Sequence, residues 1–161
     1  MSFPEEVPFE VISEKWNTYD LGNEIILKAK IVLVKILKPS GIALEEVPEL
    51  IYNAPVVIAV YAPLEKKGTP ETKELTPALV SKSISEDLDP VPLEENINEY
   101  KLEDKGFLRL RLMLTRVAMT DIFSADSSPV VAVSHQVVPQ IRLPRKSTRE
   151  RSKKKTNYVR D

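Results

Sequence analysis

Apolar and other side chains alternate along residues 25–36, and this pattern limits the possible folds more than any other feature of the chain. One face of the segment holds five apolar residues: Ile25, Leu27, Ala29, Ile31 and Leu33. The opposite face begins basic, with Lys28 and Lys30, and then becomes apolar. A period of two is typical of a half-buried β-strand, because successive side chains of a strand point to opposite sides. Counted up to Lys38, the segment has 14 residues and exceeds an ordinary strand, which predicts a bend or a β-bulge before Pro39.

Residues 106–119 repeat this alternation. Leucines at every second position share one face, and the other face carries Phe107, Arg109, Arg111 and Met113. Leu, Arg and Met are also good helix formers, so a helix is the alternative, but the strict spacing favours a strand. Residues 55–63, bounded by prolines, predict a short buried strand, and residues 130–144 predict a final strand.

The choice of apolar residues agrees with a β-rich fold. The chain contains 17 Val and 12 Ile but only four Gly, and β-branched side chains favour strands. Four or five strands joined by hairpins predict a mainly β domain over residues 1–141, a small antiparallel barrel or sandwich. A ferredoxin-like α+β arrangement is the alternative.

Residues 64–105 differ from the rest of this domain. They hold 11 acidic residues, six lysines and four prolines, with few large apolar side chains. Within them, Thr76 and Pro77 precede apolar residues at near-helical spacing, which predicts one short helix capped by Thr76. We expect an acidic, proline-containing surface insertion with this helix; a disordered stretch is the alternative.

Opposite charges are separated along the chain. Residues 142–161 carry nine basic and two acidic residues, a net charge of +7, so residues 1–141 carry −8 and the total is only −1. A segment with so many like charges repels itself and stays extended. The sequence therefore predicts a basic flexible tail on an acidic domain.

Catalytic and cofactor sites are not expected. The chain has no cysteine and one histidine, so disulfides, thiolate metal sites and multi-histidine sites are excluded. Serines, aspartates and His135 lie close together in the sequence, but no G-x-S-x-G motif accompanies them, and no glycine-rich phosphate loop can be written. His135 shares its face with valines, which favours a core or rim position, and Asp121 and Asp126 are interpreted as turn formers and not as metal ligands. We expect a protein that is not an enzyme and binds no cofactor or metal.

The basic residues are the candidate site. Seven of them cluster near the C-terminus: Arg145, Lys146, Arg149, Arg151, Lys153, Lys154 and Lys155. They could neutralise the phosphates of RNA or DNA and release counterions. Lys28, Lys30, Arg109 and Arg111 each lie opposite an apolar strand face, so a second basic surface forms if these two strands pair. The alternatives are a solvated tail, a tail folded onto the acidic domain, and an anionic membrane surface.

We expect an accessory subunit of a nucleoprotein complex. The alternative is a structural or interaction domain that self-assembles or docks on a protein through an edge strand such as 25–37, with a passive tail. The start of the chain lacks the basic and apolar regions of a signal peptide, and no apolar run is long enough to span a membrane, which predicts a cytoplasmic protein. The composition is compatible with growth at high temperature.

Overall fold

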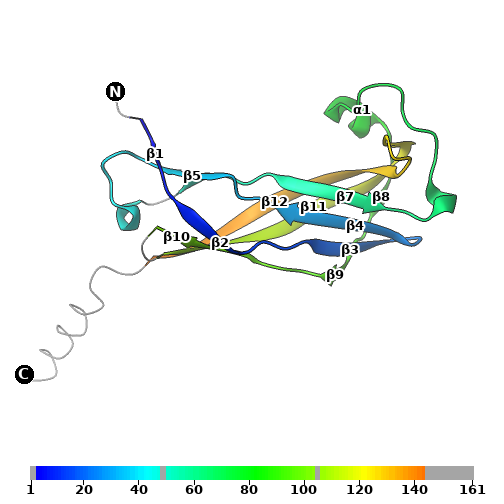
Figure 1. The fold of residues 1–161 in the computed structure, drawn as a ribbon. Helices are drawn as coiled ribbons and strands as arrows, with labels where there is room; N and C mark the ends of the chain where they lie inside the picture. Colours follow the sequence, from blue (N-terminus) through cyan, green and yellow to red (C-terminus); the bar gives the residue numbers. More distant parts are fainter. Residues whose placement is uncertain (1–2, 48–49, 104–105, 144–161) are drawn as a thin grey trace, which may run out of the picture.

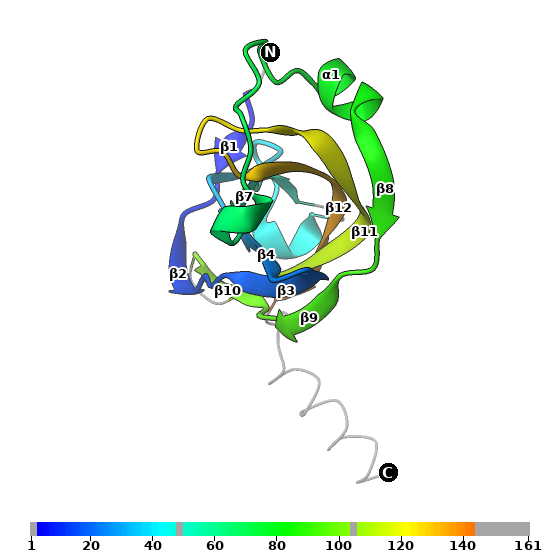
Figure 2. The ribbon, with the colours of Figure 1, turned by 90° about the vertical axis from the view of Figure 1, so that its right-hand side faces the viewer.

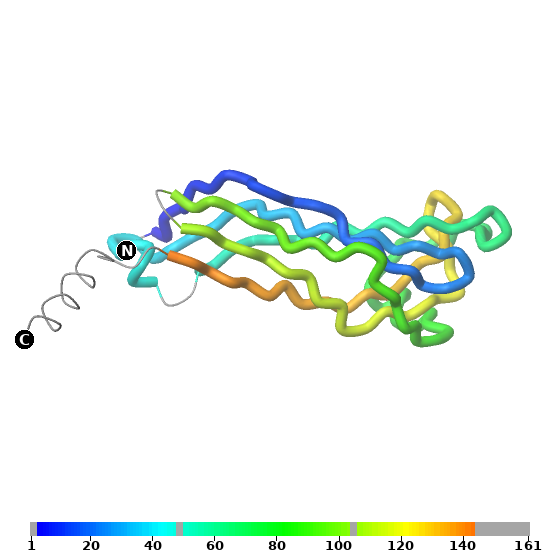
Figure 3. The backbone as a smooth tube through the Cα atoms, turned by 90° about the horizontal axis from the view of Figure 1, so that it is seen from below, coloured from blue at the N-terminus to red at the C-terminus, as the bar shows by residue number. Residues whose placement is uncertain are grey.

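The computed structural model describes residues 3–47, 50–103 and 106–143 and consists mainly of antiparallel strands that follow one long axis (Figure 1; Figure 3). The first large sheet, here the β4 sheet, has the order β7-β4-β3-β9. Its strands are β3 (Asn17–Gly22), β4 (Ile25–Ile31), β7 (Val56–Tyr61) and β9 (Val91–Glu94). A third, small sheet of order β1-β5-β6 prolongs one end of the molecule and contains β1 (Glu5–Glu6), β5 (Lys35–Lys38) and β6 (Ile51–Asn53).

The second large sheet, here the β11 sheet, has the order β12-β11-β10-β2, and one more strand, β8, pairs with the far half of β11. Its strands are β2 (Phe9–Ser13), β8 (Ile84–Leu88), β10 (Asn98–Leu102), β11 (Phe107–Phe123) and β12 (Pro129–Arg142). Two 3₁₀ turns (Leu44–Glu46 and Leu64–Lys66) and one α-helix, α1 (Pro77–Lys82), complete the described residues. The fold of residues 3–47, 50–103 and 106–143 is therefore mainly β and sandwich-like, as predicted, and these residues form no closed barrel; the ferredoxin-like alternative is wrong.

The core lies between the two large sheets, which surround it in the end-on view (Figure 2). The inward face of β4 is the predicted one, with Leu27 and Ala29 fully buried, and the inward leucines of β11, Leu108 and Leu110, are fully buried as well. Residues 106–119 thus form a strand and not a helix. A β-bulge interrupts β11 between Leu114 and Arg116.

The long segment 25–38 is divided between two sheets. β4 ends at Ile31 and β5 begins at Lys35. Leu33 is the last buried residue of the first alternation, and Ile36 is the first of the next, so the inward face changes from odd to even positions. The segment is thus interrupted before Pro39, as expected from its length, and the change of phase turns Ile36, at the apolar end of the outer face, inward.

The acidic segment 64–105 is only partly a surface element. Helix α1 forms where predicted, and its cap is confirmed because the Thr76 hydroxyl accepts a hydrogen bond from the Leu79 amide at 3.1 Å. The prediction of an insertion is wrong for residues 84–102, which form β8, β9 and β10. β10 lies inside the β11 sheet, between β11 and β2.

A polar cluster joins the two large sheets where the chain passes from β2 to β3. The Tyr100 hydroxyl donates to Glu14 Oε2 at 2.6 Å and accepts a hydrogen bond from Asn98 Nδ2 at 2.9 Å. Asn98 Nδ2 also donates to the Ile31 carbonyl at 2.8 Å. These contacts connect β10 with β4 and with the β2–β3 connection, and they leave the buried polar atoms of the cluster paired.

Candidate binding surfaces

The structure separates the four strand cations that the sequence analysis placed on one surface. Lys28 and Lys30 lie on β4, and Arg109 and Arg111 lie on β11, and these two strands do not pair. Because each strand turns its apolar face to the shared core, the two cationic pairs point outward from opposite sides of the sandwich. The predicted common basic surface is therefore wrong. The seven tail residues, Arg145 to Lys155, lie outside the described residues.

The two lysines of β4 have partners in β7 and in the β2–β3 connection. Lys28 Nζ lies 5.2 Å from the centre of the Tyr61 ring, and Lys30 Nζ lies 5.8 Å from the centre of the Trp16 ring. Lys30 is also 4.0 Å from Glu14 Oε1. Aromatic faces and a carboxylate thus hold both ammonium groups, which lie half-buried.

The arginines of β11 belong to a different surface, formed by neighbouring strands of the β11 sheet. Phe107 is paired with Arg142 of β12 on one side and with Lys101 of β10 on the other. Two and four residues further along β11, Arg109 and Arg111 point to the same outer side. We call these five residues the basic face: Lys101, Phe107, Arg109, Arg111 and Arg142. Their side chains lie on one surface because directly paired residues share a side of the sheet.

Acidic neighbours offset part of the charge of the basic face, and Lys101 is paired with Glu10 of β2. Glu99 is paired with Arg109, and its carboxylate lies 3.8 Å from the guanidinium. Glu99 belongs to the acidic segment 64–105. Arg111 lines a shallow pocket of about 190 Å³ beside Tyr19 and Glu95. Burial and then Glu95 raise the pKa of Tyr19, and Arg111 opposes them.

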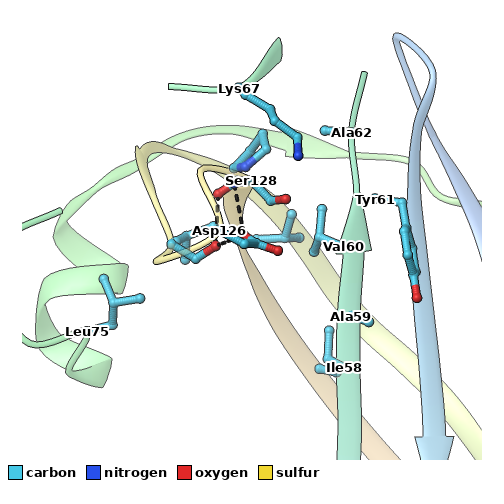
Figure 4. Close-up of a pocket in the computed structure, with 13 residues that line it drawn as sticks. Ile58, Ala59, Val60, Tyr61, Ala62, Lys67, Leu75, Asp126 and Ser128 are labelled. Carbon is cyan, nitrogen blue, oxygen red and sulfur yellow. Dashed lines mark hydrogen bonds between the residues drawn. The ribbon is translucent and has the colours of Figure 1, made fainter. Parts of the chain in front are cut away.

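A larger cavity of about 640 Å³ lies at the other end of the molecule, between β7 and the start of β12. Ile58 and Val60 point into it from β7, whereas Tyr61 points away (Figure 4). Pro129 and Val131 of β12 form the opposite wall. Its inner lining is apolar, and its polar residues lie around the β11–β12 turn.

The β11–β12 turn contains the aspartate that the sequence analysis interpreted as a turn former. Asp126 Oδ1 accepts hydrogen bonds from the Ser124 hydroxyl at 2.5 Å and from the Ser128 amide at 3.0 Å. These bonds, that from Ser124 first, lower the pKa of Asp126. The interpretation is confirmed for Asp126, whereas Asp121 lies within β11 and not in a loop. His135 is exposed on β12, which fits a rim position and not a core position.

Comparison with models of protein families, with curated proteins and with solved structures found no match to the chain. Within residues 3–47, 50–103 and 106–143, no group of three or more acidic or histidine side chains is arranged to hold a metal ion. In the same part of the chain, no helix has the length and apolar character of a transmembrane span.

Sequence reasoning missed two members of the basic face and the whole cavity. Lys101 was assigned to the insertion, and Arg142 was counted with the tail, so neither was placed next to Phe107. The alternation of Asn98, Tyr100 and Leu102 with charged residues is the signal that could have identified β10. The cavity has no comparable signal, since its two walls come from strands about 70 residues apart in the chain.

Proposed function

We propose that this protein is a non-catalytic binding protein that contacts the backbone of RNA or DNA as an accessory subunit of a nucleoprotein complex. The observation that carries the proposal is the register of β10, β11 and β12. It gathers four cations and one exposed aromatic ring on one sheet surface, and the chain continues directly from Arg142 of that surface into the basic C-terminal segment.

The chemistry of this surface suits a polyanion of no fixed sequence. Arg guanidinium groups bind phosphate oxygens in a bidentate geometry, and Lys101 adds a point charge. Phe107 is 37% exposed, so one face of its ring can stack on a base of a single strand. Residues 143–161 add eight basic residues, which supply affinity through counterion release and not through base recognition.

The proposal is tested by titrating the full chain with generic single-stranded RNA and with duplex DNA over a series of salt concentrations. If about six phosphates are neutralised, the logarithm of the binding constant falls with that of the salt concentration with a slope of about −4 to −5. A chain ending at Leu143 should show a flatter slope. Equal binding by the full and the shortened chain would contradict a role for the tail.

A second variant tests the basic face separately from the tail. Val138 is paired with Arg111 on the outer side of the sheet, so Val138→Glu places a carboxylate among the cations. We expect about a tenfold loss of affinity at low salt, equivalent to about one lost phosphate contact plus repulsion. Val57→Glu, compared on an oligonucleotide of about 8 nucleotides, is the matched control, since it places a carboxylate opposite Lys30 on the other sheet. Unchanged binding by Val138→Glu would remove the basic face from the proposal.

A further inference from the structure

β7 is an edge strand that lacks the usual protection of an edge. It pairs only with β4 in the β4 sheet, and β6 pairs only with β5, so residues 51–61 form one continuous edge. Residues 51–64 contain no Asp, Glu, Lys or Arg. The prediction of a strand within 55–63 is confirmed by β7, but its predicted burial is wrong. Edge strands normally carry charges or bulges that prevent pairing with another chain.

The other edge strands of the described residues carry a charge or a proline, although β2 and β9 also expose apolar side chains. β1, β2, β8 and β9 each carry at least one acidic residue. β12 is uncharged from Pro129 to Ile141, but it contains Pro139, and Val138 is its one large apolar residue that is strongly exposed. On β7, by contrast, Val57, Ile58 and Tyr61 are all strongly exposed. β4, within the segment 25–37 that the sequence analysis offered as an edge strand, lies between β3 and β7 and has no free side.

The hydrogen-bond phase of β7 shows which backbone groups are free. The Val32 amide donates to the Pro55 carbonyl at 2.9 Å, so residues 32 and 55 form a hydrogen-bonded pair. Such pairs alternate along an antiparallel ladder, so residues 57, 59 and 61 turn their N–H and C=O groups toward β4. Val56, Ile58 and Val60 turn theirs to the free side.

The exposure of Ile58 agrees with a free side on β7. This residue is paired with Ala29, which is fully buried, so its side chain points inward, yet Ile58 remains 37% exposed. The cavity beside β7 leaves it uncovered (Figure 4). Space, free backbone groups and uncovered apolar side chains therefore coincide on one side of one strand.

We propose that β7 pairs antiparallel with β7 of a second copy of this chain and thereby doubles the four-stranded β4 sheet. The absence of charge on β7 favours a second copy as the partner, because an uncharged strand of branched apolar residues brings no like charges into contact when it pairs with itself. A two-fold axis perpendicular to the sheet satisfies the free groups of Val56, Ile58 and Val60 in both copies at once.

The mass of the full-length protein in solution tests this pairing. Light scattering over about a hundredfold range of concentration should report a dimer that dissociates on dilution. Val57→Glu should raise the dimer dissociation constant at least about tenfold, because it puts one carboxylate from each copy into the pairing edge, while its pairing with Lys30 preserves the fold. Val138→Glu is the matched control on β12 and should leave the dimer unchanged. A monomer at every concentration, or a dimer broken by Val138→Glu alone, would overturn the proposal.

Amide hydrogen exchange locates the contact. At concentrations where the dimer forms, the amides of Val56, Ile58 and Val60 should become protected, whereas those of Val57, Ala59 and Tyr61 are protected in monomer and dimer alike. Ile58→Pro removes one free-side donor and should yield a folded monomer, since proline is tolerated where an edge N–H faces solvent. A dimer in which these three amides still exchange fast would place the interface elsewhere.

Discussion

At the scale of single residues, the link between the two large sheets is made by polar side chains. Glu14, Asn98 and Tyr100 come from the β2–β3 connection and from β10, and Asn98 bonds to the Ile31 carbonyl of β4. A polar group in such a place costs free energy unless it is paired, so each partner depends on the others. The cluster fixes where the chain crosses between sheets.

Replacing Tyr100 by Phe should lower the free energy of unfolding by about 1–3 kcal/mol, because Glu14 then loses a hydrogen-bond donor in a partly buried site. Burial and then the bond to Glu14 raise the pKa of Tyr100 above its ordinary value of 10.0. The native state thus holds this proton more tightly than the unfolded chain, so its contribution is complete below about pH 10 and is lost as the pH rises further.

Urea unfolding between pH 8 and pH 11 measures both effects. The wild type should lose more stability across this range than Tyr100→Phe, and Tyr19, whose pKa is also raised, should keep a part of the dependence in the variant. Tyr61→Phe is the matched control, because Tyr61 is exposed. Parallel pH curves for wild type and Tyr100→Phe would contradict the assignment.

Local alternation predicted much of this residue-level structure. Leu27, Ala29, Leu108 and Leu110 were assigned to the inward face from spacing alone, since period two is a property of the strand itself. The Glu14–Tyr100 contact could not be predicted, because it joins residues 86 apart through the crossing of two sheets. Pairing partners of that kind depend on topology, which alternation does not encode.

At the scale of elements, the predictions for β7 and for residues 84–102 were wrong for the same reason, because local sequence does not encode topology. β7 has the composition of a buried strand. Its burial, however, depends on its neighbours, and among the described residues only β4 pairs with it. Residues 84–102 have the composition of a surface insertion, yet β10 lies inside a sheet, where Asn98, Tyr100 and Leu102 are buried and the charged residues between them face outward. The acidic composition of residues 64–105 as a whole therefore gave no indication of the five-residue strand β10.

The connection after β7 makes a prediction at this scale. The Gly68 amide donates to the Ser127 carbonyl at 3.1 Å, which ties the segment to the β11–β12 turn. A Cβ at position 68 would lie 2.5 Å from the Phe123 ring, too close for any real contact. Gly68→Ala should therefore cost about 1–3 kcal/mol in chemical unfolding. The same substitution in a Phe123→Ala background should cost much less; an equal cost would show that the clash is not the cause.

At the scale of the whole molecule, the two proposals are geometrically connected. A two-fold axis perpendicular to the β4 sheet keeps both β11 sheets on the same side of the dimer. The basic faces of the two copies, with Arg109 and Arg111 at the centre of each, then point in one direction. Two sites on one rigid body can bind one long polyanion together, and the second contact gains from the high effective concentration created by the first.

This arrangement predicts that Val57→Glu affects long and short ligands differently. For single-stranded RNA of about 60 nucleotides, long enough for both copies, the variant should bind at least about tenfold more weakly than the wild type, because it loses avidity. For an oligonucleotide of about 8 nucleotides, which fits one copy, the two proteins should bind alike. Val138→Glu should weaken the binding of both ligands. Binding is measured by fluorescence anisotropy at one salt concentration. If Val57→Glu lost the same affinity for both RNA lengths, pairing through β7 would not couple the two basic faces.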